Sequence, residues 1–364
     1  MKQACLSCHR ISPDSNLYCQ ETYCPAELSP YILDYGEWLG DIEIVKPVIT
    51  LRSAVLYEAT HKKELVFLKV AHPGEENKER LKREAEFLRT IKLQNKEHPL
   101  LPSLMPPYAE TKIEDDAYGK AMLRGHLLYF YIFKHVAGEP LRDVLKKNPQ
   151  LWINHVGWLM IELATAVNFL HASGFYHLGI SPDVVLVRFD NEDPNVPRIL
   201  LFDFGVISDA QNLGLHWHSF FITPAYTAPE LLAQSAPRIS HATDVYGLGL
   251  TLYELLVGEP PYPFKLYSDD EVYVAVKHNR RVQMNRVEDV KKVAQIALQA
   301  TAADKAQRYQ ETAVFIHDLQ QQFGKVPPPK PSRFTWFKKN LVVLITTALA
   351  LAFLVALAGG YFAP

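Results

Sequence analysis

Two neighbouring motifs decide the fold of this chain: His171-Ala-Ser-Gly-Phe-Tyr-His-Leu-Gly-Ile-Ser-Pro-Asp-Val-Val-Leu-Val187 and, sixteen residues after it, Asp203-Phe204-Gly205. A helical apolar pattern over residues 151–172 leads into the first motif, and the apolar run Arg198–Phe202 leads into the second. An aspartate at the end of an apolar strand offers the hard oxygen ligand that magnesium prefers. The pattern therefore predicts a loop after a long helix, followed by a turn suited to a metal ion.

These motifs resemble the catalytic loop and metal-binding turn of eukaryotic-type protein kinases. Downstream, Thr223–Glu230 resembles the end of that family's activation segment, whose glutamate is expected to pair with Arg308. His241–Gly249 resembles the buried helix whose aspartate, here Asp244, caps the loop, and Gly258–Pro263 completes the likeness.

The resemblance covers residues 31–322 and implies an α+β fold of two lobes. A small β-rich lobe is expected over residues 31–136 and a large α-helical lobe over residues 137–322. Within the small lobe, residues 98–139 are expected to carry two strands around the polar loop 110–120, with Phe133 at the back of a nucleotide pocket.

The loop itself departs from the family at its working positions. In the family it reads H-R-D-L-x-x-x-N, where the aspartate accepts the substrate proton and the asparagine holds magnesium. Those two positions are Gly179 and Val184, and the lysine that steadies the transferred phosphoryl group is Ser181. Asp183 is the nearest carboxylate and would need a shifted backbone to act as base. We therefore expect a non-catalytic loop on an intact scaffold.

Lys69, in Phe-Leu-Lys-Val, resembles the strand lysine that holds the nucleotide phosphates and pairs with a helix glutamate. Glu84, in the charged helix expected over residues 75–91, is the expected partner, and Glu86 is the second choice. The alternative is that these charges are solvated at the surface. Together with Asp203, Lys69 and Glu84 are the residues expected to bind ATP and magnesium, weakly.

The glycine-rich loop of the family is missing between the first two expected strands. Its three glycine positions are taken by bulkier residues, which would stand where phosphate should lie; a misaligned, divergent loop is the alternative. These positions are Ile49, Leu51 and Ala54, between strands expected over residues 38–45 and 53–59, with a third strand over 65–71.

All four cysteines of the chain lie in its first 24 residues, in two close pairs. Paired thiolates two to four residues apart can point both sulfurs at one tetrahedral zinc ion. The sequence therefore predicts a zinc-ribbon-like segment over residues 1–28, with His9 able to replace one sulfur; ordinary thiols in a flexible leader are the alternative. The expected ligands are Cys5, Cys8, Cys19 and Cys24.

The C-terminal end carries an apolar run from Leu341 to Leu357, and no charged side chain follows Lys339. A run of this kind predicts one transmembrane helix over residues 340–360, after a Pro-rich basic linker over residues 323–339. Because Lys338 and Lys339 precede the span, the positive-inside rule places the kinase-like domain in the cytoplasm and the C-terminus on the far side. A buried helix of a globular core is the alternative.

The formal net charge is only −2, and no basic block occurs in the globular part, which excludes nucleic acid as the expected partner. We expect a membrane-anchored pseudokinase that acts as a scaffold or allosteric regulator of another signalling protein. One alternative is an active serine/threonine kinase with an altered mechanism, since phosphoryl transfer depends largely on positioning. A third hypothesis is a domain that binds no nucleotide and acts only through its surface.

Overall fold

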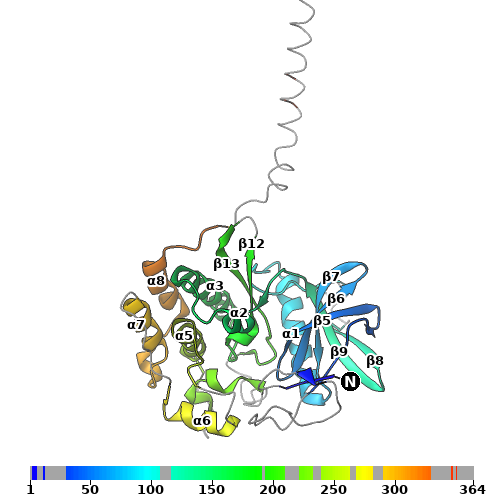
Figure 1. Ribbon diagram of the computed structural model, residues 1–364, viewed down its shortest axis with the longest axis horizontal. Coiled ribbons are helices and arrows are strands. Elements are labelled where there is room, and N and C mark those ends of the chain that lie inside the picture. Colours follow the sequence, from blue (N-terminus) through cyan, green and yellow to red (C-terminus); the bar gives the residue numbers. More distant parts are fainter. Residues whose placement is uncertain are drawn as a thin grey trace, which may run out of the picture.

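The computed structural model has two lobes, with the β-rich lobe on the right of Figure 1 and the helical lobe on the left. The structure describes residues 2–5, 11–12, 30–106, 116–190, 193–209, 221–232, 239–262, 268–281, 290–328, 346 and 350.

The small lobe is a six-stranded antiparallel sheet with the helix α1 (Glu75–Leu93) against one face. Alternate residues of a strand point to opposite faces, and in the strand β7 the two sets enter two separate cores. Phe67 packs with α1, whereas Val66, Leu68 and Val70 pack on the outer face. In sheet order the strands are β4 (Trp38–Leu39), β5 (Ile42–Thr50), β6 (Ala54–His61), β7 (Glu64–Ala71), β9 (His126–Lys134) and β8 (Gly119–Leu123).

The outer face of this sheet is covered by the N-terminal segment. A three-stranded antiparallel sheet forms there, in the order β2 (Ile11–Ser12), β1 (Lys2–Ala4) and β3 (Tyr31–Ile32). Ala4 and Ile32 join the outer core of the small lobe. Tyr31, the expected start of the small lobe, therefore pairs with the N-terminal segment instead of the main sheet.

The large lobe is built around α3 (Ile153–Ala172) and α5 (His241–Val257). α3 packs against α8 (Thr312–Phe323), α5 and the strand β13 (Asp193–Leu201). α5 is buried from Ala242 to Leu256, because neighbouring elements surround it. The remaining elements are β10 (Glu139–Pro140), α2 (Leu141–Lys147), β11 (Phe175–Tyr176), β12 (Val185–Asp190), β14 (Ser208–Asp209), α6 (Asp269–Lys277) and α7 (Lys291–Ala300), with short 3-10 helices at Pro182–Val184, Pro224–Tyr226, Pro229–Leu232 and Lys305–Gln307.

One expected strand of the small lobe is wrong. No strand precedes the polar loop in the described part of residues 98–106; only an isolated bridge joins Leu104 to Phe133. Pro102 and Pro106 lack the N–H group that a ladder needs, which explains why pairing stops there. The two strands of this span are β8, which begins within the expected loop at Gly119, and β9; a tight turn at Arg124 and Gly125, which both have positive φ, joins them.

Within the residues that the structure describes, no helix is long and apolar enough to cross a membrane. The expected transmembrane helix over residues 340–360 lies outside the described residues except at Thr346 and Ala350. Of the expected zinc ligands only Cys5 is described, and it is buried; the others, Cys8, Cys19 and Cys24, fall outside.

Candidate nucleotide and catalytic-loop site

Three charged side chains expected from the sequence meet between the lobes. Lys69 points inward from β7, and its Nζ bonds the carboxylate of Glu84 on α1 and lies 2.5 Å from Oδ1 of Asp203. Lys69 is 1% exposed and Glu84 is fully buried, so the alternative of solvated surface charges is wrong. Glu86, the second choice of partner, pairs with Arg89 instead.

The rest of the site is arranged to receive the Glu84 carboxylate. Its Oε1 accepts hydrogen bonds of 2.8 Å from the Tyr131 hydroxyl on β9 and from the Phe204 backbone N–H. Burial alone would lower the pKa of Lys69, but the carboxylates of Asp203 and Glu84 outweigh it and raise that pKa. The lysine therefore stays charged and holds the sheet, α1 and the Asp203 turn together.

The aromatic side chain after Asp203 completes this contact. Phe204 is fully buried, and its ring lies 5.5 Å from those of Phe87 on α1 and His177 in the loop. Phe133 is likewise buried at the end of β9, with its ring 5.2 Å from that of Phe67. Buried aromatic side chains therefore pack around the polar contact of Lys69, Glu84 and Asp203.

The catalytic-like loop keeps its backbone support. Asp244, at the start of α5, accepts hydrogen bonds from the backbone N–H groups of His177 (2.8 Å) and Leu178 (2.7 Å). Its carboxylate also lies 2.9 Å from Nε2 of His171. Burial opposes ionisation, but these bonds and the two histidines lower the pKa of Asp244. The anchoring role expected for Asp244 is confirmed, and Leu178 is held at a positive φ of 62°.

At the position of the catalytic base, a side chain would be crowded by two aliphatic neighbours. A Cβ atom added to Gly179 would lie 3.0 Å from Cγ2 of Val206 and 3.4 Å from Cγ2 of Ile222. Both neighbours are aliphatic, so an acidic side chain here would displace them and lose solvation. Val184, at the second metal-ligand position, and Ser181, at the lysine position, are both buried.

The one nearby carboxylate is already engaged. Oδ1 of Asp183 accepts a 2.9 Å bond from Nε of the buried Arg142, whose guanidinium also bonds Glu254 and, at 2.8 Å, the hydroxyl of Tyr226. Burial would lower the pKa of Arg142, but Asp183, Tyr226 and Glu254 outweigh it and raise that pKa. Recruiting Asp183 as a base would break this network, so its expected need for a shifted backbone is a real obstacle.

The turn that replaces the glycine-rich loop is short and folded inward. The N–H of Leu51 donates a 2.8 Å bond to the carbonyl of Ala54, which closes the turn between β5 and β6. Ile49 and Leu51 are buried and belong to the same core cluster as Phe133. Bulky side chains therefore occupy this turn, as the sequence predicts.

The residues present fit an ATP–magnesium complex only in part. Lys69 would contact the phosphates and Asp203 would bind the metal, but these two side chains are bonded to each other. The second oxygen ligand is replaced by Val184, and no glycine turn offers N–H groups to phosphate. Bound ATP and magnesium would supply the transferable phosphoryl group and its charge neutralisation.

The large lobe also carries the expected ion pair of its activation segment. Nη1 and Nη2 of Arg308 bond the two oxygens of Glu230 at 2.9 and 3.1 Å. A bidentate pair of this kind fixes the end of the segment against the helices behind it. This prediction is confirmed.

Sequence reasoning missed the Arg142 network and the contact between Arg52 and Asp269. Arg142 sits among apolar residues in Pro-Leu-Arg-Asp-Val, and a charge at the start of an apolar helix is a weak sign of a buried pair. Arg52 lies in a turn 217 residues from its partner, and no local pattern indicates such a contact.

Comparison with known proteins agrees with this geometry. The family model described as "Protein kinase domain" matches residues 53–321. The serine/threonine-protein kinase PknB of Mycobacterium tuberculosis is 27% identical over 224 residues, covering 60% of this chain and 34% of that protein. The serine/threonine-protein kinase PkaA of Streptomyces coelicolor is 35% identical over 142 residues, covering 39% of this chain and 25% of that protein.

This chain thus spans about a third or less of the length of these curated relatives. The family match, however, covers well over half of the chain, from the start of β6 to the end of α8. The chain therefore belongs to the protein kinase domain family.

Proposed function

We propose that this chain is a pseudokinase, which binds and regulates another signalling protein and does not transfer phosphate. One observation carries the proposal: the base position is Gly179, which has no side chain and lies beside the aliphatic side chains of Val206 and Ile222. Without a base or a second metal ligand, the loop lacks two groups that position the nucleophile and the metal in this family.

The third hypothesis, a domain that binds no nucleotide, is supported by the buried turn at Leu51 and by the mutual pairing of Lys69 and Asp203. Nucleotide binding is accordingly weak or absent in the proposed function. In that case the protein acts by binding a partner through the surface of its two lobes.

The second candidate is an active serine/threonine kinase with a non-standard loop. The comparisons favour it, because the relatives carry the name serine/threonine-protein kinase and family membership implies use of ATP and magnesium. The assembled contact of Lys69, Glu84 and Asp203 is the feature of the site that favours it. Positioning alone supports much of phosphoryl transfer, so this candidate is chemically coherent.

Two further proposals concern the ends of the chain. The run Leu341–Leu357 anchors the protein in a membrane as a single pass, with the kinase-like domain in the cytoplasm and the C-terminus on the far side. At the other end, β1 and β2 pair antiparallel, and the Cys5–Cys8 spacing falls in the connection between them. We propose that the four cysteines hold zinc in a ribbon-like segment. Within the described residues, no group of three metal-binding side chains gathers.

Thermal-shift titration of the purified full-length chain with ATP and magnesium or manganese separates these possibilities. Stabilisation that Lys69→Ala abolishes supports a nucleotide-responsive pseudokinase, and no shift supports the nucleotide-free scaffold. Phosphate incorporation that Asp203→Asn abolishes supports the second candidate and refutes the first. Metal analysis tests the N-terminus: less than one zinc per chain removes the ribbon.

A further inference from the structure

The turn Leu51–Ser53, here called the β5–β6 turn, contacts both lobes. From within the small lobe, His72 holds it by two hydrogen bonds. Nε2 of His72 lies 2.9 Å from the carbonyl of Leu51, and the His72 backbone N–H donates a 2.9 Å bond to the carbonyl of Ser53. The turn is therefore fixed at both ends by one residue.

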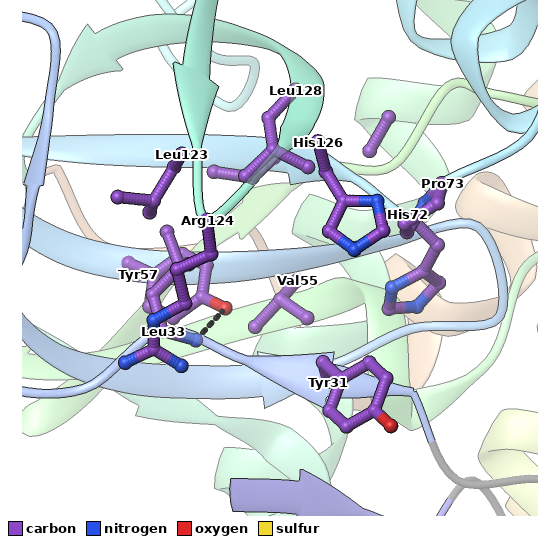
Figure 2. Close-up of a pocket in the computed structure, with 12 residues that line it drawn as sticks. Tyr31, Leu33, Val55, Tyr57, His72, Pro73, Leu123, Arg124, His126 and Leu128 are labelled. Carbon is purple, nitrogen blue, oxygen red and sulfur yellow. Dashed lines mark hydrogen bonds between the residues drawn. The ribbon is translucent and has the colours of Figure 1, made fainter. Parts of the chain in front are cut away.

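The charge state of His72 suits this role. Burial, with a smaller contribution from the nearby Lys69 ammonium, lowers the pKa of His72 to about 4. The ring is neutral at physiological pH, and its contact with a carbonyl assigns the proton to Nε2. In Figure 2 the same ring forms part of the wall of a pocket on the outer face of the sheet, beside His126 and Tyr31.

The turn also reaches the large lobe. Nη1 and Nη2 of Arg52 bond the two carboxylate oxygens of Asp269, the first residue of α6, at 2.6 and 3.0 Å. The Arg52 side chain is 16% exposed and that of Asp269 is 43% exposed. This fork-shaped pair joins residues from different lobes.

The end of the turn lies beside the Asp203–Gly205 motif. A Cβ atom placed on Gly205 would lie 3.6 Å from Oγ of Ser53 and 3.7 Å from Oδ1 of Asp203. The Ser53 side chain thus lies beside the backbone of Gly205, two residues after Asp203, while Leu51 is packed into the core that includes Leu81 of α1.

We propose that the β5–β6 turn is an intramolecular plug: it occupies the cleft in place of nucleotide phosphate and closes the two lobes on each other through Arg52 and Asp269. This inference rests on the proposed function and deepens it, because the scaffold then has one closed shape without a ligand. Lys69 and Asp203 are already paired with each other behind the turn. The closed shape is what a partner protein meets.

The test is hydrogen–deuterium exchange on the full-length chain. Arg52→Glu replaces attraction to Asp269 by repulsion, so amide exchange is expected to rise at least about fivefold in peptides covering residues 48–54 and 201–207. Arg52→Glu combined with Asp269→Arg restores the opposite charges and returns exchange to that of the unmodified chain.

The matched control is Arg124→Glu. Arg124 bonds Glu37 at 2.5 Å in a similarly exposed pair that lies within the small lobe. This variant is expected to leave exchange in residues 201–207 unchanged. If Arg52→Glu behaves like the control, or if the charge swap fails to restore protection, the plug is wrong.

Failure of the plug and failure of the proposed function are distinguishable. Phosphate transfer by the unmodified chain refutes the pseudokinase whatever the exchange pattern. An unprotected turn in a chain that transfers no phosphate refutes only the plug.

Discussion

Replacing Lys69 by methionine removes the cation from the buried contact between the lobes while keeping most of the side-chain volume. Glu84 then remains fully buried without its partner, although Tyr131 and the Phe204 N–H still donate to it. Breaking a buried ion pair on one side costs about 3–5 kcal/mol. We expect Lys69→Met to lower the free energy of unfolding by an amount in this range at pH 7.

The loss should depend on pH in a defined direction. Burial raises the pKa of Glu84, and removing Lys69 raises it further. A carboxyl whose folded pKa lies above its unfolded pKa favours the folded state at low pH and loses that contribution as the pH rises. The cost of Lys69→Met should therefore be smaller at pH 5 than at pH 8. Adding Glu84→Gln should recover much of the loss at pH 8.

Urea unfolding of the full-length chain at both pH values measures these differences. Lys147→Met is the control, because Lys147 and its partner Glu139 are exposed, and its effect should stay within about 0.5 kcal/mol. A loss of unfolding free energy below about 1 kcal/mol for Lys69→Met, together with no recovery from Glu84→Gln, would show that Lys69 and Glu84 do not form a stabilising buried ion pair.

Three further predictions concern other contacts. The pKa of His72 is about 4 in the folded chain and 6.5 when unperturbed, so the unfolded chain binds protons more readily and the free energy of unfolding should fall by about 2 kcal/mol between pH 7 and pH 5. His72→Gln should lack this pH-dependent loss in urea unfolding. The same pH slope in the variant would contradict the prediction. Gly157→Ala places a Cβ 2.2 Å from the ring of Phe323 and should cost about 1–3 kcal/mol in thermal unfolding; an unaltered Tm would argue against this packing. Arg308→Lys cannot make the bidentate bond to Glu230 and should cost about 2–3 kcal/mol, whereas an effect below about 0.5 kcal/mol would show that the pair is not structural.

The sequence predicted the two lobes and the meeting of Lys69, Glu84 and Asp203 because each lies in a motif with a fixed place in the fold. The loss of the base at Gly179 and of the metal ligand at Val184 could also be predicted, because neither residue type can accept a proton or bind a metal in any surroundings. The closeness of Val206 and Ile222 to Gly179 could not be predicted, because these two residues come from another segment of the chain.

Contacts between distant segments could not be predicted for the same reason. Arg52 and Asp269 lie 217 residues apart in the sequence, and only the folded chain brings them together. The expected strand before the polar loop was wrong, because Pro102 and Pro106 stand where a strand would need backbone donors. In the structure the missing backbone donors decide the outcome.

If the loop at Gly179 does not support catalysis, as we propose, the protein transfers no phosphate from ATP. Full-length chain should be incubated with radiolabelled ATP, magnesium or manganese, and general protein acceptors, beside Asp203→Asn prepared in the same way. We expect phosphate incorporation no greater than that of the variant. Incorporation by the unmodified chain that Asp203→Asn abolishes would contradict it.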